Sequence, residues 1–177
     1  LGLFVHMGIT YMTLLKIFTT MDIKHFLKSM APVQLLGFST SSSGATLPVT
    51  MKRCEKDLGI SEEISSFVLP LGATINMDGT ALYQGVAAVF IAQAVGMDLT
   101  LANQFTIVAT AVLASIGTAA VPGAGIIMLI IILEAINVPS EGIALILGVD
   151  RILDMIRTAT NVTGDATVAS VMDSLER

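Results

Sequence analysis

Nearly half of the chain, from Ile64 to Val149, contains neither lysine nor arginine. Over the whole sequence, 54% of the residues are hydrophobic, only 13% are charged, and the mean hydropathy is +0.83. An ordinary soluble domain carries more charge than this, and a long stretch without basic residues is typical of polypeptide that crosses a bilayer. We therefore expect an all-α membrane protein with several passes.

The charged residues and the cysteine exclude several other classes. Nine basic residues stand against fourteen acidic ones, and without a basic stripe or many aromatic residues the chain is not expected to bind nucleic acid. Cys54 is the single cysteine, which excludes an internal disulfide or a cysteine metal cluster. Six of the nine basic residues lie between Lys16 and Lys56, so the positive-inside rule places this end in the cytoplasm.

Apolar and polar runs divide the sequence into five expected segments. The sequence lacks an initiator Met and opens on Leu1 inside an apolar run, so we expect it to be part of a longer protein. We expect no signal peptide, because a basic start and a cleavage site are missing. A polar connector around 51–63 is expected in water. The segments are the end of a transmembrane helix with an amphipathic connector (1–29, the connector at 22–29), a re-entrant hairpin (30–51), a broken transmembrane helix (64–96), a second re-entrant hairpin (104–137) and a last transmembrane helix (140–172) that begins with Ser140 as its N-cap.

The order of these segments suggests an inverted repeat. A hairpin with a Ser/Gly-rich tip is followed by a helix with a polar centre, and this happens twice. The polar centres are also similar, with Asn-Met-Asp-Gly-Thr at 76–80 and Asn-Val-Thr-Gly-Asp at 161–165. Inverted repeats with interrupted helices are typical of secondary transporters, whose binding site lies where the interruptions converge.

The last helix carries the side chains with the clearest chemistry. Asp154, Arg157, Thr158, Asn161 and Asp165 follow a spacing of i, i+3, i+4, i+7 and i+11, which places them on one face. The planar Arg157 side chain can hold a carboxylate with two hydrogen bonds, and Asp154 can receive an ammonium group. This face therefore predicts a receptor for an acidic amino acid. The alternative is a set of internal ion pairs, with Arg157 bound to Asp154 or Asp150.

Other polar residues point to ions. Asp78 and Asp165 lack basic partners in the apolar sequence, so they predict either a hard monovalent cation held by oxygen ligands or carboxyl groups that carry protons. The tip at 41–44 offers backbone N–H groups to an anion. His6 and His25 are expected to be a packing residue and a surface residue.

These residues resemble the glutamate transporter family of sodium-coupled dicarboxylate and amino-acid symporters. The resemblance covers nearly the whole chain and rests on four motifs in order: Ser-Ser-Ser-Gly-Ala-Thr-Leu-Pro at 41–48, Asn-Met-Asp-Gly-Thr at 76–80, Ser-Ile-Gly-Thr at 115–118 with Val-Pro-Gly-Ala-Gly at 121–125, and the polar face of the last helix.

The resemblance implies a role for each matching residue. Arg157 and Thr80 would take the side-chain carboxylate of the substrate, Asp154 and the Val121 carbonyl its amino group. The α-carboxylate would bind Asn161, Thr158 and the Ser43 backbone. Sodium would occupy three sites: one formed by Asp165 with the carbonyls of Gly72, Asn76 and Asn161; one formed by the carbonyls of Thr74, Ser115, Ile116 and Thr118; and one formed by the side chains of Asn76 and Asp78 with residues upstream of this sequence.

The resemblance also implies an elevator mechanism in the inner or plasma membrane. The transport domain slides past a trimeric scaffold that is missing here, so the full-length protein is expected to be a homotrimer in the lipid bilayer. No cofactor is implied besides the coupling sodium ions. Relatives carry an additional arginine where this chain has Ser41 or Met155, and Arg151 is the nearest basic residue that could replace it.

Competing functions are disfavoured by missing motifs. An intramembrane aspartyl protease would need Gly-x-Gly-Asp and Tyr-Asp, and other enzymes a nucleophile elbow, a phosphate loop or a zinc-ligand pair; none occurs. The chain is therefore not expected to be an enzyme. A passive channel does not need Arg157 and Asp154 side by side. The remaining alternative is a proton- or sodium-coupled symporter for dicarboxylates or neutral amino acids.

Overall fold

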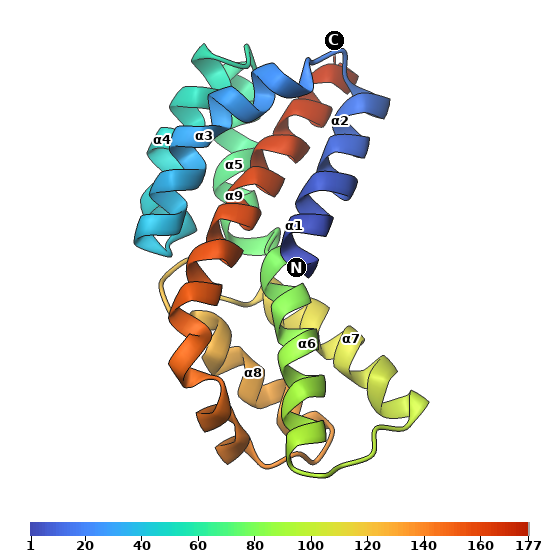
Figure 1. Cartoon of the computed structure of the whole chain (residues 1–177). Helices are drawn as coiled ribbons and strands as arrows, with labels where there is room; N and C mark the ends of the chain where they lie inside the picture. The colour runs from blue at the N-terminus through green and yellow to red at the C-terminus, as the bar shows by residue number, and fades with distance from the viewer. Residues whose placement is uncertain (177) are drawn as a thin grey trace.

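The computed structural model describes residues 1–176 and forms them into helices, without a strand in this range, which confirms the all-α prediction. Two helical bundles are stacked end to end, and one long helix, α9, runs through both (Figure 1). The elements are α1 (Gly2–His6), η1 (Met7–Tyr11), α2 (Met12–Phe18), α3 (Ile23–Thr40), α4 (Ser43–Lys56), α5 (Glu62–Ile75), α6 (Asp78–Ala94), α7 (Leu101–Ile116), α8 (Ala124–Ala135), η2 (Ser140–Leu145) and α9 (Leu147–Glu176).

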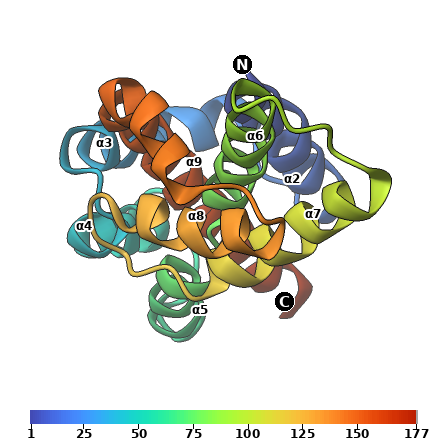
Figure 2. The same ribbon diagram turned by 90° about the horizontal axis from the view of Figure 1, so that it is seen from below.

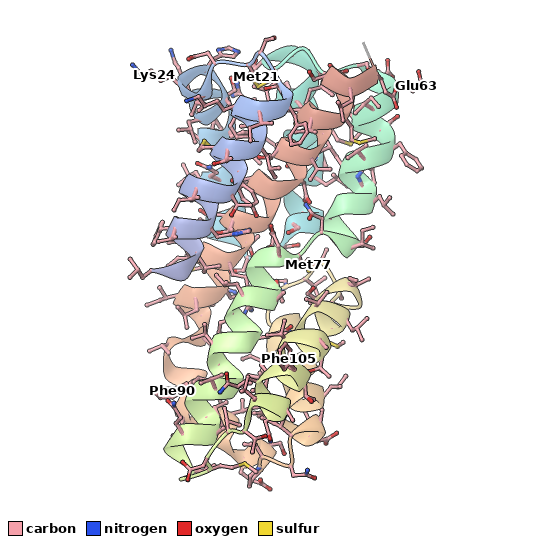
Figure 3. All side chains as sticks on the ribbon, turned by 90° about the vertical axis from the view of Figure 1, so that its right-hand side faces the viewer. Met21, Lys24, Glu63, Met77, Phe90 and Phe105 are labelled. Carbon is pink, nitrogen blue, oxygen red and sulfur yellow. The ribbon has the colours of Figure 1, made fainter. Side chains whose placement is uncertain are left out.

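Each bundle has its own apolar core. Leu15, Phe26 and Leu69 belong to the core of the upper bundle, which contains α2 to α5 and the C-terminal part of α9. Ile91 and Leu133 belong to the core of the lower bundle, where α6, α7 and α8 pack together (Figure 2). Figure 3 shows Met77 at the junction of the two bundles. The polar segments are gathered at this junction, so the two cores hold a polar layer between them.

The first helix is continuous from α1 through α2, but its middle, η1, is a π-helical turn. It ends at Phe18, close to the expected end of the apolar run. The predicted separate connector at 22–29 is wrong, because α3 begins at Ile23 and continues to Thr40. Asp22 caps this helix by accepting a hydrogen bond from the His25 N–H at 2.8 Å, and the helix continues past the internal Pro32 to the tip.

Two pairs of adjacent helices present short tips to the junction. Between α3 and α4, Ser41 takes the left-handed conformation at φ 52°, and the Ser42 side chain caps α4. Between α7 and α8, the connection from Gly117 to Gly123 ends with Gly123 at φ 77°, a conformation that glycine adopts without strain. Both tips fall inside the hairpins expected at 30–51 and 104–137, whose re-entrant character stays a prediction.

The helix break between α5 and α6 falls within the segment where a broken helix is expected. Asn76 and Met77 have ψ values of 56° and 57°, which lie outside the helical region, and α6 starts at Asp78. The chain resumes helical structure with an acidic residue in the first turn, where the helix dipole favours it. The break exposes backbone groups at the junction of the bundles.

The last segment differs from its prediction at the start. Ser140 does not cap α9; it opens the short 3₁₀ helix η2, and α9 begins only at Leu147 and runs to Glu176. The 3₁₀ turn follows Pro139, whose ring fixes the backbone before the helix. Unlike 76–80, the polar centre at 161–165 lies inside an unbroken helix. Within residues 1–176, no helix combines the length and the apolar character needed to cross a membrane.

Candidate functional site

Four polar segments converge where the two bundles meet: the tip at 41–42, the break at 76–77, the tip at 117–123 and the middle of α9. The two tips touch directly. The Ser42 hydroxyl donates to the Ala120 carbonyl at 2.7 Å, and the Gly44 N–H donates to the same oxygen at 3.2 Å. One carbonyl oxygen of the second tip therefore accepts hydrogen bonds from two donors at the start of α4.

A small cavity lies behind these tips. Its volume is about 20 Å³, which is room for roughly one water molecule. All seven residues predicted to bind substrate line it, although they come from four distant parts of the chain. The lining residues are Ser41, Ser43, Met77, Thr80, Thr118, Ala119, Ala120, Val121, Gly125, Asp154, Arg157, Thr158 and Asn161.

Arg157 is the most buried charged side chain of this cavity, at 2% exposure. Its Nη2 and Nε donate to Asp154 Oδ1 at 2.7 and 3.2 Å, and Nη1 lies 3.8 Å from Asp150 Oδ1. The internal ion pairs that the sequence left open are thus present. Nη1 makes no hydrogen bond to a described residue, so one arm of the guanidinium is available to a further acceptor.

Two residues around Arg157 were missed by sequence reasoning. The guanidinium carbon lies 4.2 Å from the ring centroid of Tyr83, whose hydroxyl donates to Asp150 at 2.6 Å. Gly125 also lies against the guanidinium, because a Cβ there would be 3.0 Å from the guanidinium carbon. Tyr83 therefore stabilises the cation through its ring, and a larger residue than glycine at 125 would crowd it. Both sit on helices distant in sequence, so no local pattern reveals them.

Asp154 connects Arg157 to the second tip. While Oδ1 binds the guanidinium, Oδ2 accepts a hydrogen bond from the Gly123 N–H at 2.9 Å. This carboxylate is buried at 5% exposure. An amino group could take the place of the Gly123 N–H only if the tip moved, so recognition at Asp154 and the position of the tip are linked.

Asn161 joins α9 to the start of α6. Its Nδ2 donates to the Thr80 hydroxyl at 3.0 Å, and its Oδ1 accepts from the Gly79 N–H at 2.9 Å. A Cβ at Gly79 would lie 2.7 Å from that oxygen, so the absence of a side chain permits the close approach. Asn161 therefore satisfies a donor exposed by the helix break, while Thr158 lies one turn earlier on the same cavity wall.

Asp165 forms a separate polar centre with the break. Asn76 Nδ2 donates to its Oδ1 at 3.0 Å, and no lysine or arginine among residues 1–176 forms an ion pair with it. A Cβ at Gly72 would lie 2.7 Å from the same oxygen, so the backbone of α5 approaches the carboxylate closely. A buried carboxylate beside a side-chain amide, without a basic partner among the described residues, has the type of oxygen ligand that suits a sodium ion.

Asp78, a predicted ligand of a further sodium ion, has its own hydrogen-bond partners. Asp78 contacts the first helix: both its oxygens lie 2.7 Å from the Tyr11 hydroxyl, and Oδ2 lies 2.7 Å from His6 Nε2. His6 is therefore a polar partner of Asp78 and not simply a packing residue. His25 is exposed, as expected, with its Nε2 2.7 Å from the Asp57 carbonyl oxygen.

The carbonyl ligands expected for a further sodium ion lie mainly around the end of α7. The Ser115 carbonyl already accepts the Thr118 N–H at 3.3 Å, and the two hydroxyls donate to carbonyls of their own helix turn. Ile116 is 47% exposed. Thr74 is exposed at the end of α5, a helix that contacts α7.

Among residues 1–176, no second arginine lines the cavity that contains Arg157. Ser41 lines the cavity with a buried hydroxyl that has no hydrogen-bond partner among the described residues. Arg151, the basic residue considered as a replacement, is exposed and forms no ion pair within residues 1–176. The buried acids of α9, namely Asp150, Asp154, Asp165 and Asp173, outnumber its one buried base.

Comparison with known proteins gives one consistent result. The model of the sodium:dicarboxylate symporter family matches residues 1–175. The chain is 46% identical over 176 residues to mouse excitatory amino acid transporter 3, covering 99% of this chain and 34% of that protein. It is 43% identical over 171 residues to an excitatory amino acid transporter of Caenorhabditis elegans, covering 97% and 34%. The chain spans about a third of the length of the curated relatives it matches.

Proposed function

Since the chain belongs to the sodium:dicarboxylate symporter family, we propose that it forms the substrate- and ion-binding part of a secondary active symporter for an acidic amino acid, aspartate or glutamate. The observation that carries this proposal is the buried Arg157, held by Asp154 and Tyr83 with Nη1 unbonded at a cavity lined by Ser43, Thr80 and Asn161. The names of the relatives, excitatory amino acid transporters, support the same substrate class.

In this proposal, the substrate binds across four parts of the chain: α4, α6, the second tip and α9. Its side-chain carboxylate is held by Arg157 and Thr80, because the unbonded Nη1 of the guanidinium can donate hydrogen bonds to a carboxylate in a defined orientation. The α-carboxylate takes hydrogen bonds from Asn161, Thr158 and the backbone of Ser43. The amino group lies between Asp154 and the Val121 carbonyl.

The second tip serves as the gate. A cavity of about 20 Å³ is too small for an amino acid, so residues 117–123 have to move outward before binding. Three polar contacts hold this tip: the Ser42 hydroxyl and the Gly44 N–H on the Ala120 carbonyl, and the Gly123 N–H on Asp154. A substrate amino group can replace the last of these contacts once the tip closes again.

Sodium neutralises the acids that substrate does not reach. The first ion binds Asp165 with the carbonyls of Gly72, Asn76 and Asn161, and a second uses the carbonyls of Thr74, Ser115, Ile116 and Thr118. A third binds Asn76 and Asp78. Uncompensated buried charge is costly, so a cation at Asp165 lowers the cost of moving this site through an apolar region.

The proposed setting is the inner or plasma membrane. There α3 with α4 and α7 with α8 form re-entrant hairpins that alternate with the broken helix and α9 in an inverted repeat. The complete protein is a homotrimer in which this region moves as an elevator. The exposed apolar side chains, such as Phe67, Leu101 and Phe105 at 70, 71 and 72%, are consistent with lipid or scaffold around these helices.

A dicarboxylate symporter is the second candidate, and one contact favours it. Asp154 is already bound by the Arg157 guanidinium and the Gly123 N–H. If this pairing persists when substrate binds, no carboxylate is left for an ammonium group, and the site suits two carboxylates.

The test is a binding panel on the complete gene product that contains this chain, purified in detergent. Aspartate, glutamate, succinate and alanine are titrated by calorimetry with sodium or with choline. We expect aspartate or glutamate to bind only with sodium, and Arg157→Lys to weaken this binding at least tenfold because lysine lacks the planar fork. The control is Arg151→Ala, which removes an exposed arginine from the same helix. Binding of succinate alone would establish the second candidate, and binding of aspartate or glutamate without sodium would reject sodium coupling in favour of proton coupling.

A further inference from the structure

The first helix contains a π-turn at Met7–Tyr11, and this turn changes which side chains share a face. In an ordinary α-helix, residues five apart point about 140° away from each other. The i to i+5 pattern of a π-turn brings such residues into line, and these turns occur frequently at functional sites. His6 and Tyr11 are five residues apart, and their rings meet edge to face with centroids 4.8 Å apart.

Both side chains converge on one carboxylate, Asp78 at the start of α6. The Tyr11 hydroxyl lies 2.7 Å from each of its oxygens, His6 Nε2 lies 2.7 Å from Oδ2, and the Gly79 N–H donates to Oδ1 at 2.9 Å. Three groups thus lie within hydrogen-bond distance of this carboxylate, although the single Tyr11 proton can bind one oxygen at a time and the Gly79 N–H is shared with Asn161 Oδ1. The protein therefore already directs hydrogen-bond donors at Asp78, and a proton directed at the carboxylate repels a cation.

The placement of Tyr11 depends on a third element. A Cβ at Gly164 of α9 would lie 2.7 Å from the Tyr11 hydroxyl oxygen and 3.0 Å from its ring carbon. The phenol, 3% exposed, therefore occupies space that only a glycine leaves open. The π-turn, this glycine and the helix break together hold one hydroxyl on Asp78.

We propose that Tyr11 and His6 are positioning residues that compete with the coupling cation for Asp78 and so set the cation affinity of this site. The inference deepens the proposed function and rests on it, because it concerns the sodium ion assigned to Asp78. A cation reaches the carboxylate only when at least one donor is displaced. The hydroxyl can rotate its proton away, and this releases the first helix from the helix break.

The test measures sodium binding in the complete gene product without substrate, by calorimetry. Tyr11→Phe keeps the ring and removes the donor, so sodium binding is expected to tighten about tenfold, the value of one hydrogen bond to a charged group. His6→Ala frees Oδ2 alone and is expected to tighten binding less. The control is Ile9→Ala, which changes an exposed residue of the same π-turn and leaves sodium affinity unchanged.

A double variant separates this role from a general effect on folding. In an Asp78→Asn background, Tyr11→Phe is expected to have no further effect on sodium affinity, because both act on the same carboxylate. Hydrogen exchange supplies a second readout: sodium is expected to increase exchange in Gly2–Phe18 of the natural protein and to have less effect in Tyr11→Phe.

The outcomes distinguish this inference from the proposed function. If the natural protein binds sodium but Tyr11→Phe binds it equally or more weakly, the competition is wrong and Tyr11 is structural or a direct ligand. If the effect persists in the Asp78→Asn background, Tyr11 does not act through Asp78, which also overturns the inference. If the natural protein binds no sodium, the proposed function itself fails.

Discussion

The two polar centres of the chain, 76–80 and 161–165, have similar residues, but the helix is interrupted in the first and continuous in the second. In the first, Asn76 and Met77 interrupt the helix, and the N–H groups at the start of α6 need acceptors from elsewhere. In the second, α9 continues, and its Asn161 supplies one of those acceptors to the Gly79 N–H at 2.9 Å. The broken segment depends on the unbroken one, because a fixed side chain must meet its exposed donors.

The two carboxylates of these centres differ in the same way. Asp78 lies at the start of a helix, where the dipole and the Gly79 N–H favour a negative charge, and it also contacts Tyr11. Asp165 lies in mid-helix and accepts one hydrogen bond from Asn76. Asp165 therefore has fewer hydrogen-bond donors than Asp78, and under the proposed function we expect it to contribute more to sodium coupling.

Proline substitution tests whether the backbone at 76–77 differs from that at 161–165, and it has the largest expected effect. Val162→Pro removes a backbone donor inside α9 and places a ring against the preceding turn, so we expect a loss of about 3 kcal/mol or more. Met77→Pro acts where the helix is already interrupted and is expected to cost clearly less. Both losses of unfolding free energy are measured on the purified complete protein by following its helix content with far-ultraviolet circular dichroism. Equal losses of unfolding free energy would contradict this difference, because they would mean that residue 77 also lies within a continuous helix.

Alanine at the glycines of α6 tests the contact between the two centres. Gly79→Ala places a Cβ 2.7 Å from Asn161 Oδ1 and 3.1 Å from the Arg157 carbonyl, so we expect a loss of about 2 kcal/mol and weaker substrate binding. Gly85→Ala is the matched control, since nothing lies within 4 Å of its Cβ, and it is expected to gain about 0.5 kcal/mol from helix propensity. A stable Gly79→Ala with normal binding would refute the close approach.

Cysteine labelling tests whether the upper bundle, which contains Cys54 and the C-terminal part of α9, stays closed. Its expected effect is the smallest of the three. Burial raises the pKa of the Cys54 thiol to about 12, so the protonated form dominates at neutral pH. A maleimide is therefore expected to react slowly at both pH 7 and pH 9, whereas a thiol introduced at the exposed Glu63, in the connector expected in water, reacts rapidly. Rapid labelling of Cys54 would show that this bundle opens.

The break and the polar face were predictable because their causes are local. Asn-Met-Asp-Gly-Thr combines poor helix formers with a start signal for α6, and the i, i+3, i+4, i+7 spacing requires only regular helix geometry to gather Asp154, Arg157 and Asn161. The sequence did not indicate that α9 stays continuous through the similar pentapeptide at 161–165. There, the Thr160 and Thr163 hydroxyls bond to carbonyls of the preceding turn, and the surrounding helices bury them.

Contacts between distant helices could not be predicted from the sequence. The π-turn that aligns His6 with Tyr11 leaves no composition signal, so His6 looked like a packing residue. Tyr83 stacks on Arg157 because α6 and α9 cross at that level, and a single sequence does not give this register. The sequence also did not show that the residues of the expected connector at 22–29 join the hairpin arm in one helix, α3. Asp22 marks the start of a helix but does not determine where that helix ends.

The most direct test of the account is the dependence of aspartate affinity on sodium concentration in the natural protein and in Asp165→Asn. Coupling is reciprocal, so each sodium ion bound together with substrate steepens this dependence. We predict a steep dependence in the natural protein and a clearly shallower one in Asp165→Asn, with a smaller change in Asp78→Asn. An aspartate affinity that depends on sodium equally in all three proteins would contradict the assignment of Asp165 as the principal sodium ligand.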